Sequence, residues 1–540
     1  MNDVAIDEVL AGLVAQFASP YDFLRELVQN AMDAGSDRVE VLLHTHAAGD
    51  GVVFELEIVD AGEGMDESIL DGELTRLFAS TKTGDRTQAG GFGIGFVSVF
   101  AWAPQTVLLH TGRAGETWEL LFHADKRYEK HRIDAPFEGT TVRLFRPGKA
   151  EEREDIAESV RQSLWKWCRF VALDITFEDV DGQAGPEVIR DTPPSDEEAL
   201  VAVHEEGETR VRVSFAVPPH AVLLRHGLVL GEGLPAEEMP GIARALGDSL
   251  EHVRVWADSP LLRTDLARDR VVDDDGRKAI ERIVLALVVR LRDELIARVE
   301  ALAGTTGSWS AELHAMYSHL HAHLACERTA AGDRLRERAV VRLASGGASS
   351  PSLLARRATC GLVLACDPTV RDSDTLALQA AAEQAGMPTL AALPDDRGWL
   401  APLFAGVELR ALAHALVRVE PATVPVDSLC ALVGQVLARA ELPVARVALG
   451  RWQGGASVHG WGIEVHASPC VVGLALPRVP GAALTVWLDE HHVLVEAAIR
   501  HASIDPLHAA TALALVIARG WAEPVELDDF ADAVDAVRAA

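Results

Sequence analysis

One predicted helix, apolar on one side and functional on the other, constrains this chain most. The segment from Phe23 to Ala34 spaces its apolar residues as a helix that packs on a core. Glu26, Asn30 and Asp33 stand at positions i, i+4 and i+7, so they share one face of that helix. Polar groups are costly to bury without partners. An acid, an amide and a second acid on one face therefore indicate a place for a metal-bound phosphate and an attacking water.

A second motif follows a predicted strand. The run 54–58 alternates apolar residues with glutamates, which is typical of a half-buried strand. Asp60 ends this strand, and a turn containing Gly62 and Gly64 leads to Met65. Glycines let the backbone approach a flat ligand closely. A carboxylate at this strand end can accept the exocyclic amino group of adenine.

The third motif is the glycine-rich run 90–95, which leads into an apolar helical segment. Backbone N–H groups at a helix start can face an anion. A dinucleotide site would also use such a loop, but it needs a strand just before the loop and an acid about 20 residues further on. Here a polar segment, residues 80–85, precedes the loop instead and is typical of a lid.

In this order and spacing, the three motifs resemble the GHKL ATPase superfamily, which includes gyrase B, histidine kinases, MutL and the ninety-kilodalton heat-shock chaperones. The resemblance covers roughly residues 5–145. Within the superfamily, segments 23–31 and 92–96 are most similar to the heat-shock chaperones and related bacterial ATPases. MutL proteins carry Gly-Phe-Arg-Gly-Glu-Ala where this chain has residues 91–96.

The resemblance implies an α/β fold. The N-terminal domain would be a two-layer α/β sandwich of the Bergerat type, a mixed sheet with helices on one face. An α/β middle domain and an α/β C-terminal region would follow. We expect an ATP-binding domain at 1–148 and a chaperone-type middle domain at 149–302. A helical segment with a linker would follow at 303–350, then an α/β unit at 351–440 and a C-terminal, possible dimerisation domain at 441–540.

The resemblance also assigns roles to single residues. Glu26 would be the general base, since proton transfer needs a positioned acceptor. Asn30 would hold Mg²⁺ through its side-chain oxygen, because magnesium takes few protein ligands. Asp60 would bind the adenine amino group. The other residues expected to contact ATP are Asp33, Gly64, Met65, Lys82, Gly93, Gly95, Phe96 and Thr140. Lys82 is the weaker match, because one residue of the family's segment is missing before it.

A later segment, residues 258–270, is similar to part of the chaperones' middle domain. By that match Arg268 reaches the γ-phosphate, a task that suits a guanidinium because it is always charged and binds phosphate oxygens in bidentate fashion. Arg263 is the alternative if the register slips. A surface ion pair of Arg268 with Asp265 or Asp269 is the structural alternative.

Charge and hydropathy limit the partners. The formal net charge of -31 is spread along the chain, which argues against a nucleic-acid partner and against anionic membranes. It favours protein partners with basic or apolar patches. The N-terminal sequence lacks the pattern of a signal sequence, and no run of 18 or more apolar residues predicts a membrane span. We therefore expect a cytoplasmic protein. Analogy with the chaperones at the level of the fold suggests a homodimer.

These expectations combine into a magnesium-dependent ATPase of the heat-shock-chaperone type, which couples ATP binding and hydrolysis to domain closure and to remodelling of client proteins. The alternative is an ATP-gated switch or clamp in DNA repair, signalling or defence that acts through a dedicated protein partner. A third interpretation is a nucleotide-sensing scaffold without hydrolysis. The presence of Glu26 argues against the scaffold.

Overall fold

The structure of this protein is a computed structural model that divides into two compact units, one ending at Leu291 and one beginning at Arg292. It describes residues 19–74, 92–124, 127–195, 200–265, 270–305, 311–325, 335–358, 361–404, 406–422, 426–453, 459–467, 470–473, 483–521 and 525–540.

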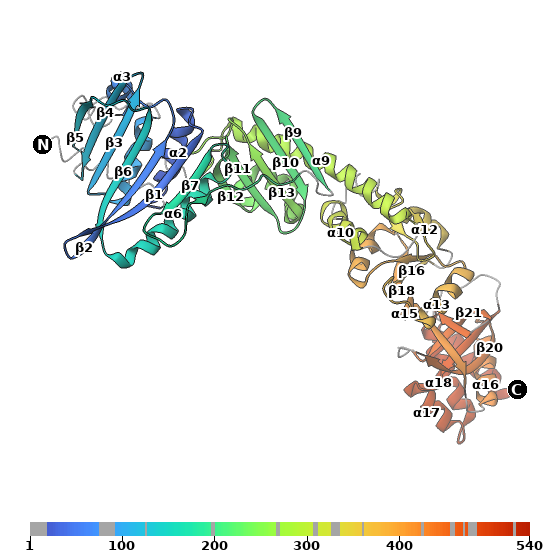
Figure 1. Ribbon diagram of the computed structural model, residues 1–540. Helices are drawn as coiled ribbons and strands as arrows, with labels where there is room; N and C mark the ends of the chain where they lie inside the picture. The colour runs from blue at the N-terminus through green and yellow to red at the C-terminus, as the bar shows by residue number, and fades with distance from the viewer. Residues whose placement is uncertain are drawn as a thin grey trace. The chain divides into compact units, whose positions relative to one another are not determined.

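An eight-stranded mixed sheet, in the order β5-β4-β3-β6-β2-β1-β7-β8, forms the first layer of the N-terminal unit (Figure 1). Its strands are β1 Arg38–Ala48, β2 Gly51–Asp60, β3 Thr106–Arg113, β4 Glu116–His123, β5 Tyr128–Ile133, β6 Gly139–Gly148, β7 Asp174–Asp179 and β8 Glu187–Val188. β1 and β7 pair in parallel, and the other neighbours pair antiparallel. Strand β7 lies beyond residue 148, so this sheet extends past the expected first boundary.

Helices α2 (Phe23–Asp33) and α6 (Arg153–Cys168) pack against each other and form the second layer (Figure 1). Shorter helical turns complete it: α3 Glu67–Ile69, η1 Leu70–Leu74, α5 Phe92–Val97, η3 Ser98–Trp102 and η4 Ala150–Glu152. Every second residue of β1 is buried from Val39 to Leu43, as strand alternation requires, and joins the core with the apolar side of α2. The expected sandwich, a mixed sheet with helices on one face, is confirmed.

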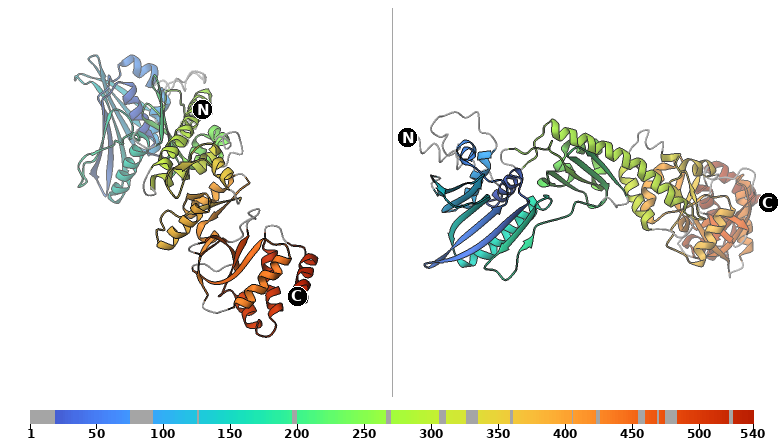
Figure 2. Two further views of the ribbon diagram at one scale, coloured as in Figure 1. Left: turned by 90° about the vertical axis from the view of Figure 1, so that its right-hand side faces the viewer. Right: turned by 45° about the horizontal axis from the view of Figure 1, so that its top comes forward.

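A second, five-stranded sheet follows in the same unit, in the order β12-β11-β13-β10-β9. Its strands are β9 Val201–Glu206, β10 Thr209–Phe215, β11 His220–Arg225, β12 Leu228–Gly233 and β13 Val253–Asp258. Its helical elements are α7 Pro235–Glu238, α8 Pro240–Leu246, η5 Gly247–His252 and the first part of α9 Asp275–Gly304, which runs beside the sheet (Figure 2) and belongs to this unit as far as Leu291.

The two sheets of this unit share one hydrophobic core. Leu224, Leu228 and Trp256 from the second sheet belong to the same buried cluster as the first sheet and its helices. The ring of Phe170, just after α6, meets Trp256 edge to face at 6.5 Å. Apolar packing therefore joins the first sandwich to the second sheet.

The C-terminal unit is also α/β. A three-stranded parallel sheet has the order β17-β16-β18, and a closed barrel has the order β19-β20-β23-β21-β22. The strands are β14 Val341–Arg342, β15 Ala348–Ser349, β16 Leu362–Cys366, β17 Thr389–Ala391, β18 Glu408–Ala411, β19 Leu416–Pro421, β20 Val444–Gln453, β21 Trp461–Ala467, β22 Cys470–Gly473 and β23 Leu484–Asp489.

The helical elements of this unit are α10 Ala311–Leu320, η6 His321–Ala325, α12 Pro351–Arg357, α13 Ser373–Gln384, η7 Pro394–Asp396, α14 Arg397–Leu400, η8 Ala401–Leu403, α15 Leu412–Ala415, α16 Asp427–Arg439, α17 Val493–His501, α18 Pro506–Arg519 and α19 Leu527–Ala539. None of the helices described in either unit combines the length and the apolar composition that crossing a bilayer requires.

Two hairpin turns of the second sheet give a matched test of the shared core. Gly227 and Gly207 both have positive φ, +83° and +57°, but only Gly227 meets the neighbouring layer, where an added Cβ would lie 2.7 Å from Val171 Cα. Gly207 has no atom within 4 Å of that position. We expect Gly207→Ala to cost about 1 kcal/mol through its backbone alone. Gly227→Ala should cost a further 1–3 kcal/mol or so, because the two layers must separate. Equal losses in the free energy of unfolding, measured with denaturant, would contradict the shared core.

Candidate functional site

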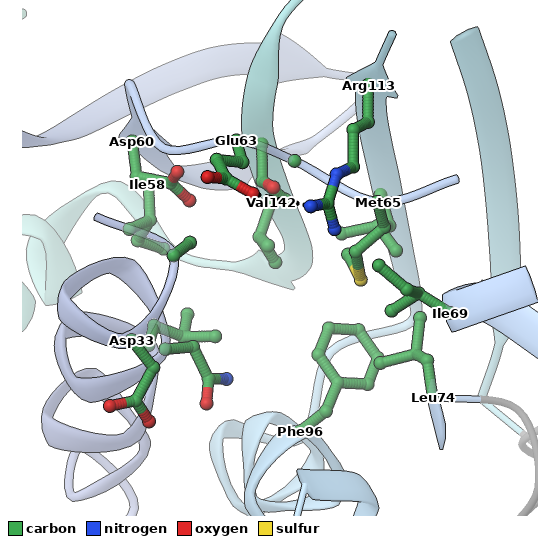
Figure 3. A pocket seen from close by; sticks show the side chains of 16 residues that line it. Asp33, Ile58, Asp60, Glu63, Met65, Ile69, Leu74, Phe96, Arg113 and Val142 are labelled. Carbon is green, nitrogen blue, oxygen red and sulfur yellow. Dashed lines mark hydrogen bonds and ion pairs between the residues drawn. The ribbon is translucent and has the colours of Figure 1, made fainter. Parts of the chain in front are cut away.

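A cavity of about 220 Å³ opens between α2, the end of β2 and strands β3 and β6 (Figure 3). This volume is far larger than a single water needs. Seven of the residues expected to contact ATP line it: Asn30, Asp33, Asp60, Gly64, Met65, Phe96 and Thr140.

Asp60 ends β2 and places its carboxylate at the cavity wall. Its Oδ1 accepts a hydrogen bond of 2.9 Å from the Gly62 N–H. Burial raises the pKa of Asp60, while hydrogen bonds from the backbone of Gly62 and Thr140 act in the opposite direction. A half-buried carboxylate that keeps such partners is a strong acceptor for a ligand that brings a further N–H donor.

Glycine is required at the turn that follows Asp60. Gly64 has φ +67°, and a Cβ there would collide with the carbonyl oxygens of Gly112 and Gly139. The turn therefore lies directly on the ends of strands β3 and β6, and no side chain separates its backbone from them. At Gly62, a Cβ would lie 2.7 Å from the Cβ of Ala34, so the turn also packs on the end of α2.

One hydroxyl ties this turn to the sheet. The Met65 N–H donates to Thr111 Oγ1 at 2.9 Å, and that oxygen lies 3.1 Å from Gly139 O and 3.2 Å from Thr140 Oγ1. A hydroxyl donates one hydrogen bond and accepts two. If Thr111 donates to Gly139, it accepts from Met65 and Thr140, which leaves the lone pairs of the Thr140 oxygen for a ligand.

The two sides of the cavity differ in character. Figure 3 shows the carboxylates of Asp33 and Asp60 on one side, and Ile69, Leu74 and Phe96 on the other. Such a cavity suits a ligand with a flat apolar part and polar edges.

The phosphate-binding residues are placed only in part. Phe96 packs on Phe122 with ring centroids 5.3 Å apart, which anchors α5 beside the cavity. The backbones of Gly93 and Gly95 belong to the same helix, which lies next to α2. Lys82 and Arg268 lie outside the described residues.

Glu26 lies one turn before Asn30 on α2 but does not line the cavity. Only 2% of its surface is exposed. Its Oε1 is 3.7 Å from Nε of Arg25, a second buried charge. The expected base therefore lies buried on the same helix whose later residues, Asn30 and Asp33, line the cavity.

Of the sixteen residues that line the cavity, nine were not expected from the sequence, and two of these nine are charged. Arg113, at the end of β3, and Glu63, in the glycine turn, form an ion pair of 2.5 Å at the cavity (Figure 3). Glu63 stands between two motif glycines and could have been suspected from that position. Arg113 ends a strand about 50 residues away, and only the sheet order brings it here.

Comparison with known proteins agrees with this geometry. Residues 19–144 match the family model of the histidine kinase-, DNA gyrase B-, and HSP90-like ATPases. The chain is 28% identical over 145 residues to the DNA mismatch repair protein MutL of Rhodospirillum rubrum. This match covers 26% of the chain, and it spans only 22% of the length of that MutL.

The match and the motifs together identify the first domain. The expected membership of the GHKL superfamily is confirmed for this part of the chain, and domains of this type bind and hydrolyse ATP. The finer likeness to the heat-shock chaperones is not shown, because the matched family also includes the kinases and gyrase, and the relative found is a repair protein. Residues 19–144 thus form a GHKL-type ATPase domain.

Proposed function

We propose that this protein binds Mg-ATP in the cavity beside α2 and hydrolyses it to drive a change in protein conformation. One observation carries the proposal: six residues from three separated motifs, together with Thr140, line a single cavity. The matched ATPase family agrees with it.

The adenine would occupy the end of the cavity near Asp60. The carboxylate would accept the exocyclic amino group, and Ile58, Met65 and Val142 offer apolar surface to the ring faces. Guanine presents an oxygen at the same ring position, which a carboxylate repels. Asp60 would therefore favour ATP over GTP.

The phosphates would extend towards α2 and α5. The donor set fits magnesium, because Asn30 offers one amide oxygen and the ion takes its remaining ligands from phosphate and water. Asp33, at the end of α2, could accept hydrogen bonds from waters around that ion. The backbone of Gly93 and Gly95 would contact phosphate oxygens. Bound magnesium would neutralise charge on the leaving phosphate.

Glu26 would act as the general base and take the proton of the attacking water. Arg268 would contact the γ-phosphate, as the similarity of residues 258–270 to the chaperones' middle domain implies. The described residues on either side of it pair antiparallel, with a bridge between Thr264 and Val271 and a 2.8 Å hydrogen bond from the Val272 N–H to Arg263 O.

The work that follows hydrolysis would be chaperone-like remodelling of client proteins by a cytoplasmic homodimer. The sequence similarity of segments 23–31 and 92–96 to the heat-shock chaperones supports this choice. A second candidate is an ATP-gated switch in DNA repair, signalling or defence with one dedicated partner. The match to a mismatch repair protein favours that candidate.

Asp60→Asn tests nucleotide recognition. We expect ATP affinity to fall at least about tenfold, because a charged acceptor is lost. Burial raises the pKa of Asp60, so its ionised form is disfavoured in the folded state and loss of the charge should not lower the melting temperature of the nucleotide-free protein. Asp66→Asn, at a helix cap outside the cavity, is the control and should bind ATP normally. Equal affinities of the parent and Asp60→Asn, measured by calorimetry, would refute the assignment.

Glu26→Ala tests the chemical step. Turnover in steady-state ATP hydrolysis should fall by about 10²-fold or more, the scale for loss of a general base. ATP binding should persist, since Glu26 does not line the cavity. Glu40→Ala on the exposed side of β1 controls for loss of a glutamate. If Glu26→Ala hydrolyses ATP as fast as the parent, the proposed mechanism fails.

Adding an unfolded protein to the parent separates the two candidate functions. Turnover that depends on Glu26 and changes with several unrelated unfolded proteins would support chaperone-like remodelling. Turnover that depends on Glu26 but ignores all of them would favour a dedicated partner.

A further inference from the structure

A buried cation lies beside the proposed base. Arg25 and Glu26 are 5% and 2% exposed, and Arg25 Nε lies 3.7 Å from Glu26 Oε1. That distance exceeds a hydrogen bond, so this contact acts through charge. Neighbouring side chains on a helix point about 100° apart and do not normally face each other. Something outside α2 must therefore turn the guanidinium towards Glu26.

The tryptophan Trp167 on α6 does this. The Arg25 guanidinium carbon lies 4.7 Å from the centroid of the Trp167 ring, within the range of a cation–π interaction. Trp167 is itself fixed, because its Nε1–H donates to Asp22 Oδ1 at 3.0 Å. Asp22 precedes α2 directly, so α6 holds both the start of that helix and its buried cation.

We infer that Trp167 is a positioning residue for ATP hydrolysis: it holds the positive charge of Arg25 against Glu26 and so keeps the carboxylate in place. The inference rests on the proposed role of Glu26 as general base. Trp167 touches no substrate and acts only through Arg25.

The other ionisable groups at this contact do not replace Arg25. Burial raises the pKa of the Cys168 thiol to about 12, with Glu26 acting in the same direction and Arg25 against it, so the thiol is neutral near neutral pH. Lys166 Nζ lies over the Trp167 ring at 4.2 Å, and Asp22 binds the ring nitrogen. Of these described groups, Arg25 is the cation that contacts Glu26.

Helix α6 also contacts the second sheet. Just after Trp167, Arg169 pairs with Glu232 of β12 at 2.7 Å, and Phe170 meets Trp256. Trp167, which contacts Arg25, is therefore two residues before Arg169, where the contacts between the two sheets (the seam) begin. Residues 167–170 therefore contact both Arg25 and the second sheet.

The test compares ATP hydrolysis by the parent, Trp167→Leu, Trp167→Phe and Trp165→Leu across the acid and neutral range. For Trp167→Leu we expect kcat to fall by about tenfold, the size of a buried cation–π contact. The acid limb of the pH–rate profile should move to higher pH, because Glu26 loses its nearby positive charge. The Kd for ATP should stay within about twofold of the parent, since Trp167 does not line the cavity.

Two variants separate positioning from packing. Trp167→Phe keeps an aromatic face for Arg25 but loses the hydrogen bond to Asp22, so its rate should lie between those of the parent and Trp167→Leu. Trp165 is a second tryptophan on α6, but its Nε1–H donates to Glu187 at 3.0 Å, so Trp165→Leu should behave as the parent. The inference would be overturned if Trp167→Leu had the parent rate, if Trp165→Leu were equally slow, or if Trp167→Phe were no faster than Trp167→Leu.

A further substitution keeps the test decisive if Trp167→Leu does not fold. Arg25→Gln removes the positive charge that contacts both Trp167 and Glu26, so the same slower kcat is expected. A parent rate in Arg25→Gln would refute the inference. If Glu26→Ala itself hydrolyses ATP normally, the general base is misassigned, and the positioning role falls for that separate reason.

Discussion

The packing of α2 on the mixed sheet is the constraint on which the whole site depends. Phe23, Leu24 and Val28 are almost completely buried in the core. Each such side chain contributes about 1.5–3 kcal/mol when it leaves water. Since a helix turns about 100° per residue, this burial fixes the rotation of α2 and thereby the direction of Asn30 and Asp33. A rotation by one residue would expose part of the core and move both polar groups away from the cavity.

Local rules explain what the sequence could predict. The period of α2, the alternation along β2 and the glycines after Asp60 are properties of short segments, and each segment adopts the expected form. Gly64 shows why a motif can be so informative: its positive φ and the two carbonyl oxygens beside it admit no side chain. The mixed sandwich followed from the resemblance that these motifs carry, and seven of the sixteen residues that line the cavity were expected with it.

Long-range pairing explains what the sequence could not predict. Thr111 and Arg113 reach the site because β3 pairs with β6, which places Thr111 opposite Thr140. Nothing within β3 encodes that register. Likewise β7 completes the first sheet beside β1 although α6 separates it from the earlier strands. In the C-terminal unit, β19 pairs with β20, so the barrel combines residues from both sides of the expected boundary at 440.

The shared core also bears on where ATP could produce movement. Domains of one chain usually move relative to each other unless their interface is large and hydrophobic. Here Leu228 and Trp256 lie inside the core of the first sandwich, and opening the seam would expose them to water. That cost opposes separation of the two sheets. Helix α6, besides connecting β6 to β7, contacts Arg25 through Trp167 and the second sheet through β12.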